Sequence, residues 1–507
     1  MYIKQNLFSN QQLRGLKLAI LLNHGEEPCD YTHICRHLHC SFLTLQTEIA
    51  HLASFGEVRA LPYVEPHLEV QYRPEFGPQK LFQSILNETP SMRLVEALFY
   101  NDFDSLEELA EALFTSLSTL KRLIKRTNVY LQLGFNCVIN VRSVRIVGPE
   151  HSVRLLYLKY FTEVYDYYAW PFLDSINEIA LTSLVDMTTS KFSHRVTHSL
   201  FAYLKIMSAV NLIRFSKGYR VNEVYPRSYS LYEKLKEDPT FLHLSELFWR
   251  DFGKPLDQVA LSEMFSTYFR QDLILNAELD RQNTDKEVEG VTYEDMLETL
   301  EGIENRFGMV IANKSEISLL IYNALILKEH DIYENFLVYD YREPYIAYFK
   351  DSYPKLLEAF QEALSAPFKA KGVELAKERQ NHLLYILLVN WDNLFFHISR
   401  AIDKQKVLVV EKGTCNSGQF LIAYAGQYFD IAIHDHHQID MHKIKEEYDV
   451  VLTDQTLEVV DGVDIIYFSQ LVPSIALEKL NKFLKKKNSE AFLRRTEGRI
   501  NQIFVND

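Results

Sequence analysis

With 507 residues the chain is too long for one ordinary domain, and roughly three to five domains are expected. A hydrophobic content of 47% indicates a well-packed, mainly helical protein, and five cysteines without paired spacing or a secretory signal indicate the reducing cytosol. The longest apolar runs, such as residues 383–389, are far too short to span a membrane. The net charge of −14 is concentrated after residue 150, which is typical of a regulator with a locally basic head and an acidic body.

A helix-turn-helix pattern is predicted near the amino terminus, beginning after Asp30. Apolar residues recur at helical spacing on both sides of a short turn, and Ser41 is placed to cap the second helix. The outward residues of that helix can touch phosphates or base edges but supply little charge: Thr44, Gln46, Thr47 and His51. A wing is expected from residue 56 to residue 70.

The same pattern recurs 75 residues later. Ser105 and Glu108 form a capping box before the first helix, Phe114-Thr115 make the turn, and Ser116 is placed to cap the second helix. The matched positions are Ile34, Cys35, Leu38, Ser41, Thr44, Leu45 and Ile49 in the first copy and Leu109, Ala110, Leu113, Ser116, Thr119, Leu120 and Ile124 in the second. Two copies in register, each with a wing, favour DNA binding over the alternative of a solvated basic helix on a bundle.

Positive charge is concentrated in and after the second copy. The stretch from Thr115 to Ile146 holds six Lys or Arg and no Asp or Glu, as expected for contacts with phosphates. The candidate DNA contacts are Ser118, Thr119, Lys121, Arg122, Lys125 and Arg126 in the second helix, Arg142 and Arg145 beyond it, and Thr44, Gln46 and Thr47 in the first copy.

The second wing is predicted between residues 131 and 147. The run from Leu131 to Val141 reads as a β-hairpin that turns near Gly134-Phe135-Asn136. Such a hairpin would place Arg142 and Arg145 beside the basic helix and extend its positive surface.

Helical periodicity follows Gly148-Pro149 and continues for about 250 residues. A polar break at residues 280–287 divides this region into two blocks of similar size. The first block contains a helix predicted from Phe192 to a stop at Lys217-Gly218. Histidines occur in both blocks: His194 and His198 in the first, His330 and His382 in the second.

A small α/β unit with a parallel sheet is predicted after Lys406. The continuous apolar run at its start is typical of a buried parallel strand. Strands are expected at residues 406–410, 429–434, 449–453 and 464–468, with helices at 419–428 and 475–487.

In this order the elements resemble the Mga/AtxA family of virulence transcription regulators from Gram-positive bacteria, over nearly the whole chain. The resemblance implies a multidomain, mainly α protein that acts in the cytoplasm as a transcription activator, not as an enzyme, and that binds double-stranded DNA as a homodimer without a cofactor. The implied domains are two winged helix-turn-helix modules (1–70 and 71–155), two helical regulatory, or PRD, domains (156–282 and 283–402), and a domain like the IIB component of the sugar phosphotransferase system (403–507).

The resemblance also implies that regulatory histidines are phosphorylated by the histidine phosphocarrier protein of sugar uptake. His198 and His382 lie in the helical contexts expected for such sites. His194 and His330 are close alternatives.

The terminal domain departs from its enzyme relatives at one position. In a IIB phosphotransferase a cysteine directly follows the first strand, in a loop whose backbone N–H groups cradle the phosphate. Glu411 stands at that position here, and its carboxylate would repel a phosphoryl group. We therefore expect a dimerisation or sensing module, although Cys415 lies four residues later.

Two alternative functions are weaker. A phosphotransferase component acting through Cys415 has no use for two helix-turn-helix modules. An RNA-binding antiterminator shares the paired regulatory domains but carries a small β domain where this chain is helical. The histidines near residue 434 show no clear ligand geometry, so no metal is expected: His434, His436, His437 and His442.

Overall fold

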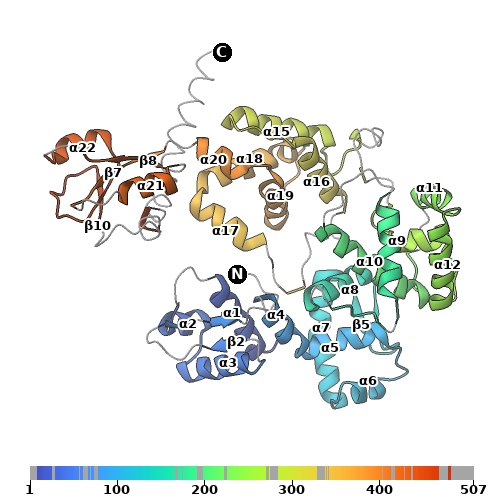
Figure 1. Cartoon of the computed structure of the whole chain (residues 1–507). Coiled ribbons are helices and arrows are strands. Elements are labelled where there is room, and N and C mark those ends of the chain that lie inside the picture. Colours follow the sequence, from blue (N-terminus) through green and yellow to red (C-terminus); the bar gives the residue numbers. More distant parts are fainter. Residues whose placement is uncertain are drawn as a thin grey trace. The chain divides into compact units, whose positions relative to one another are not determined.

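The computed structural model divides the chain into two compact units (Figure 1). The first comprises residues 1–283 and 326–340, and the second comprises residues 284–325 and 341–507. The structure describes all residues except 1–7, 25–28, 56–57, 61–66, 69, 73–77, 166–168, 174, 191–197, 222–224, 270–272, 275–283, 328–336, 339, 341, 402–403, 413–416, 427–428, 436–437, 468–477 and 481–507.

The first unit begins with a small helical group that carries short strands. Its helices are α1 (Asn10–His24), α2 (Tyr31–Leu38), α3 (Phe42–Ser54) and α4 (Pro78–Asn87). Its strands pair antiparallel, β1 (Cys29–Asp30) with β3 (His67–Leu68) and β2 (Val58–Ala60) with β4 (Val70–Tyr72). α1 packs against α2, α3 and α4. Ser41 caps α3 as predicted, because its hydroxyl accepts the Thr44 N–H at 3.2 Å.

After α5 (Pro90–Tyr100) comes the second copy of the pattern, formed by α6 (Leu106–Ala112) and α7 (Leu117–Phe135). The predicted position of its hairpin is wrong. α7 continues through Gly134 to Phe135, and the hairpin pairs β5 (Val138–Asn140) with β6 (Arg145–Val147). Leu131 and Phe135 are buried at helical spacing and extend the helix, which then ends at Asn136 in the left-handed conformation (φ 47).

A helical block completes the first unit. Its helices are α8 (Glu150–Val164), α9 (Glu178–Thr189), α10 (His198–Ser216), α11 (Pro226–Leu235), α12 (Pro239–Phe252) and α13 (Gln258–Met264). α10 packs against α8, α9 and α13, and it ends before Gly218 (φ 89), as predicted. Residues 192–197 of the helix expected there lie outside the described residues. The apolar core runs without interruption from these helices into α5 and α7.

The second unit contains a helical block and a parallel sheet. The helices are α15 (Tyr293–Phe307), α16 (Lys314–Leu327), α17 (Arg342–Ser352), α18 (Pro354–Ala370), α19 (Lys377–Asn390) and α20 (Leu394–Ala401). Thr292 and Asp295 form a full capping box at the start of α15, and α18 packs against α15, α17 and α19.

The predicted parallel sheet is confirmed. Its strands are β7 (Gln405–Val410), β8 (Phe429–Ile433), β9 (Val450–Thr453) and β10 (Asp464–Tyr467), arranged in the order β10-β9-β7-β8. All three strand pairs are parallel. Two helices accompany them, α21 (Ser417–Ala425) and α22 (Met441–Glu447). The helix predicted at 475–487 lies almost wholly outside the described residues.

Candidate nucleic-acid interface

The turn between α6 and α7 is fixed by local hydrogen bonds. Ser105 accepts the Glu108 N–H at 3.2 Å and starts α6, while the Glu108 carboxylate accepts the Asp104 N–H at 2.9 Å. Ser116 starts α7 by accepting the Thr119 N–H at 3.2 Å. Its hydroxyl also bonds those of Ser118 (3.0 Å) and Thr119 (2.9 Å), so three hydroxyls cluster at the first turn of α7.

α7 has one apolar face and one cationic face. Leu120 and Ile124 are buried in the core, whereas Lys121, Arg122 and Lys125 are exposed. Arg126 is half-buried, and its Nη2 lies 3.5 Å from the Ser91 hydroxyl of α5. Ser118 and Thr119 are exposed at the amino-terminal end of the same helix. The structure thus brings together all six residues predicted on this helix.

The wing is joined to α7 through Asn128. Its side-chain amide donates to the Ile139 carbonyl at 3.0 Å and accepts the Ile139 N–H at 2.7 Å, which holds β5 against the helix. Asn140 accepts the Arg142 N–H at 2.9 Å and stabilises the hairpin turn. Arg142 and Arg145 are exposed, so the hairpin adds two cations to the same part of the unit.

The first copy presents a different surface. α3 contains no Lys or Arg, and Glu48 is buried on it in an ion pair with Arg14 of α1 at 2.9 Å. His51 lies 3.3 Å from the Glu88 carboxylate. Gln46 and Thr47 are exposed, and Thr44 is half-buried. These groups can form hydrogen bonds with DNA but cannot supply the charge that α7 carries.

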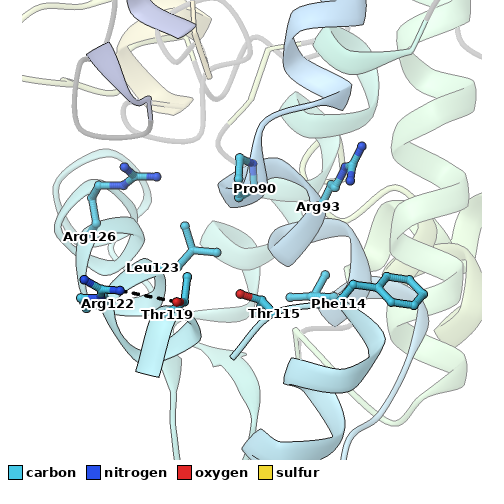
Figure 2. Close-up of a pocket in the computed structure, with 9 residues that line it drawn as sticks. Pro90, Arg93, Phe114, Thr115, Thr119, Arg122, Leu123 and Arg126 are labelled. Atoms are coloured by element: carbon cyan, nitrogen blue, oxygen red, sulfur yellow. Dashed lines mark hydrogen bonds between the residues drawn. The ribbon is translucent and has the colours of Figure 1, made fainter. Parts of the chain in front are cut away.

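A cleft separates α7 from the start of α5 (Figure 2). Its volume is about 550 Å³, and it is lined by Pro90, Arg93, Leu113, Phe114, Thr115, Thr119, Arg122, Leu123 and Arg126. Sequence reasoning missed Arg93, which stands alone in the first turn of α5 without a charge pattern around it. Only the packing of α5 beside α7 places it near the arginines of α7.

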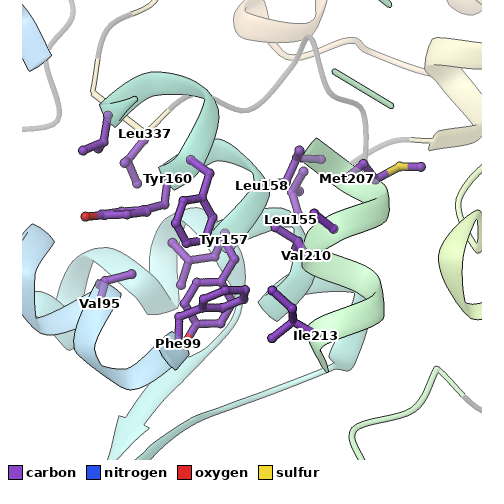
Figure 3. Close-up of a cluster of buried hydrophobic side chains, with 14 of the residues drawn as sticks. Val95, Phe99, Leu155, Tyr157, Leu158, Tyr160, Met207, Val210, Ile213 and Leu337 are labelled. Carbon is purple, nitrogen blue, oxygen red and sulfur yellow. The ribbon is translucent and has the colours of Figure 1, made fainter. Parts of the chain in front are cut away.

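The carboxyl-terminal half of α7 is anchored by Leu337, which with Val338 belongs to the inserted segment, the stretch 326–340 of the first unit. The buried Tyr130 hydroxyl donates to the Leu337 carbonyl at 2.9 Å. Glu163 of α8 accepts the N–H groups of Leu337 and Val338 at 2.6 and 2.9 Å. Burial, with a smaller effect of Glu163, raises the pKa of Tyr130 well above its usual range, so the phenol remains a donor. Figure 3 shows Leu337 beside Tyr160 of α8.

The candidate phosphorylation sites are described unequally. His382 is buried on α19, with its Nδ1 3.2 Å from Nη1 of the buried Arg342 on α17. His198 is the first residue of α10. His194 and His330 lie outside the described residues.

Glu411 directly follows β7 in the terminal domain, at the position where the enzyme relatives carry a cysteine. Its carboxylate accepts the Gly418 N–H at the start of α21, at 3.2 Å. The carboxylate therefore engages one N–H group at the start of α21, whereas residues 413–416, Cys415 among them, lie outside the described residues.

Metal clusters and membrane-spanning helices are both absent from the part of the chain that the structure describes. Among the residues with described positions, no group of three His, Cys, Asp or Glu could hold a metal ion. His434 and His442 belong to this part, but His436 and His437 do not. The described helices are all too short or too polar to cross a lipid bilayer.

Comparison with known proteins identifies the family. The model of the Mga helix-turn-helix domain matches residues 75–161, and that of the M protein trans-acting positive regulator (MGA) PRD domain matches residues 177–394. A protein of Streptococcus pneumoniae serotype 4 described as a trans-acting regulator is 20% identical over 481 residues, which cover 92% of this chain and 96% of the relative. The capsule synthesis positive regulator AcpB of Bacillus anthracis is 24% identical over 176 residues, 34% of this chain and 35% of AcpB. The chain therefore belongs to the Mga-like family of trans-acting regulators, with an Mga helix-turn-helix domain followed by an Mga PRD domain.

Proposed function

We propose that the protein is a transcription activator that binds duplex DNA through α7 and its wing. The observation that carries this proposal is the exposed cationic face of α7, which lies in an otherwise acidic chain. Basic side chains on an exposed recognition helix neutralise phosphates, while hydroxyls at its amino-terminal turn can reach base edges. The description of the family as positive regulators supports activation, and the capsule-related name of one relative supports control of virulence genes.

The proposal is tested with a double variant outside the cleft, Lys121→Ala with Lys125→Ala. Both side chains are exposed, so the fold should be unaffected. The slope of log affinity against log salt should fall by about one for each lost phosphate contact. A matched variant, Lys355→Ala with Lys369→Ala on α18, removes the same charge from exposed positions in the second unit. If the two variants bind duplex DNA with equal affinity and salt dependence, α7 is not the DNA-binding element.

We further propose a homodimer held largely by the terminal α/β domain. Two-fold symmetry would double the DNA contacts, and Glu411, whose carboxylate bonds the Gly418 N–H, stands where a transferase would need its cysteine. Deletion of residues 405–507 should shift the mass in light scattering toward a monomer and weaken operator binding. A truncated protein that stays dimeric at micromolar concentration would place the interface elsewhere.

Regulation by phosphorylation completes the proposed function. The division into five domains remains a prediction. His198 and His382 are the proposed targets of the phosphocarrier, and His194 and His330 are the alternatives. Arg342 beside His382 supports this choice, because a guanidinium can pair with a phosphoryl group. The same modification would bring negative charge next to the buried Leu383 and Leu384. Its effect on the packing of α19 would therefore decide whether phosphorylation raises or lowers activity.

A further inference from the structure

The cleft between α5 and α7 has an unusual lining for a surface of this acidic protein. Three arginines line it, Arg93 from α5 and Arg122 and Arg126 from α7, and no carboxylate is among the lining residues. Thr115 and Thr119 add hydroxyl groups, and Pro90, which has no N–H group, marks the start of α5. The guanidinium charge and the hydroxyl groups therefore favour an anion.

The three guanidinium groups make one hydrogen bond of ordinary length and two long ones within the protein. Arg93 donates from Nε to the Asn87 carbonyl at 2.9 Å, Arg122 reaches the Thr119 hydroxyl at 3.5 Å, and Arg126 reaches Ser91 at 3.5 Å. Two of these contacts are at the long limit of a hydrogen bond. Among the ion pairs between described residues, none involves these three arginines.

The guanidinium group of Arg126 is in addition partly removed from water. Its Nε is enclosed by the protein and has no hydrogen-bond acceptor in the described structure. A guanidinium that is partly removed from water without a counter-charge attracts an anion more strongly than an exposed one. The volume of about 550 Å³ is sufficient for a phosphate together with the sugar attached to it.

We propose that this cleft is a phosphate-binding site in which Arg93 acts together with Arg122 and Arg126. Guanidinium groups match phosphate oxygens with paired hydrogen bonds, which explains three arginines rather than three lysines. The phosphate can come from the DNA backbone, in which case the site extends the proposed function from α7 to α5. It can also come from a free phosphorylated small molecule.

Full-length Arg93→Gln separates these sources in two measurements. The first is the salt dependence of duplex binding, on a specific and a nonspecific sequence. The second is the melting temperature in inorganic phosphate compared with chloride at equal ionic strength. Arg93 is exposed and loses only its bond to the Asn87 carbonyl, so the unliganded melting temperature should change little. Arg122→Gln is the second variant. Arg93→Lys keeps the positive charge but removes the planar guanidinium that can donate paired hydrogen bonds. Arg250→Gln on α12 is the matched control.

A salt slope lowered by about one per chain, with equal loss of affinity on both sequences, supports the DNA backbone as the source. A saturable stabilisation by phosphate that Arg93→Gln abolishes supports a free phosphorylated ligand. If both the slope and the phosphate response match those of Arg250→Gln, the cleft is not a phosphate site. A wild-type protein that binds no duplex would contradict the proposed function, but the phosphate titration would still decide the role of the cleft.

Discussion

At the scale of single residues, Phe114 combines two unfavourable features. It has a left-handed backbone (φ 52), and its side chain is 98% exposed. A non-glycine residue with this backbone is strained, and an exposed phenyl ring gains little from burial. The position gives the chain its sharp turn between α6 and α7, and the side chain forms part of the cleft wall.

Phe114→Gly should therefore stabilise the first unit by roughly 0.5–1 kcal/mol, because glycine adopts this backbone without strain and no buried contact is lost. Thermal unfolding of the full-length protein measures the change. Leu133→Gly is the contrasting variant, since Leu133 is also exposed but lies within α7 with a helical backbone, where glycine should destabilise by about 1 kcal/mol. A loss of stability in Phe114→Gly would mean that the ring makes stabilising contacts.

The sequence predicted which side chains of α7 are exposed, but it did not predict which residues line the cleft. Lys121 and Lys125 were expected to face outward because the apolar residues of the helix fall on one face, and the structure confirms this. Arg93 gave no comparable signal. Its importance depends on the packing of two helices whose relevant residues are about thirty positions apart, and local periodicity contains no information on such contacts.

At the scale of elements, the wing shows why the hairpin was predicted at the wrong position. Tyr130, Leu131 and Phe135 are apolar and could belong to a strand or to a helix, and Gly134 suggested a turn. Tertiary packing decided for the helix, since all three apolar side chains are buried. The parallel strands of the terminal sheet were easier to predict, because residues 407–410 and 450–452 are short buried runs rich in valine, a β-branched residue that favours strands.

The inserted segment supports a prediction about α8. Glu163→Ala would leave the buried N–H groups of Leu337 and Val338 without their carboxylate acceptor, at a cost of about 1–3 kcal/mol for each unsatisfied group. The first unit should melt at a lower temperature, and hydrogen exchange at these two amides should accelerate. Glu178→Ala, which breaks a more exposed ion pair with Lys205, should cost less than about 1 kcal/mol. Unchanged exchange at Leu337 and Val338 would show that the segment is held by its apolar contacts alone.

At the scale of the whole molecule, helices of the matched PRD region and helices of the matched helix-turn-helix domain share one core within the first unit. Lys217 at the end of α10 donates to the Phe99 and Tyr100 carbonyls of α5, at 2.8 and 2.9 Å. Tyr130 contacts a residue 207 positions later in the chain. The order of the elements could be read from the sequence, but not this continuity, because contacts over such separations leave no local pattern. A change in the packing of α10 or of the inserted segment therefore has a direct physical route to α5 and α7.

Within the first unit that route connects His198, the first residue of α10, with α5 and α7, whereas His382 belongs to the second unit. Phosphorylation of both residues can be measured directly. Incubation of the full-length protein with phosphoenolpyruvate, the first enzyme of the sugar pathway and its phosphocarrier should produce an acid-labile label on these two residues. Because His382 is buried, its labelling requires local opening of α19, and it should therefore be slower than labelling at an accessible site. His243→Ala removes an exposed histidine of α12 and serves as the control that keeps the full label.

The double variant His198→Ala with His382→Ala should lose the label, and the modified wild type should bind duplex DNA with a different affinity from the unmodified protein. The physical reason is that each phosphoryl group adds a charge of about −1.5 to −2 to a packed helix, beside Arg342 in one case and at the start of α10 in the other. An unlabelled wild type would exclude this form of regulation. A label that persists in the double variant would instead assign it to other histidines, with His194 and His330 the first to replace.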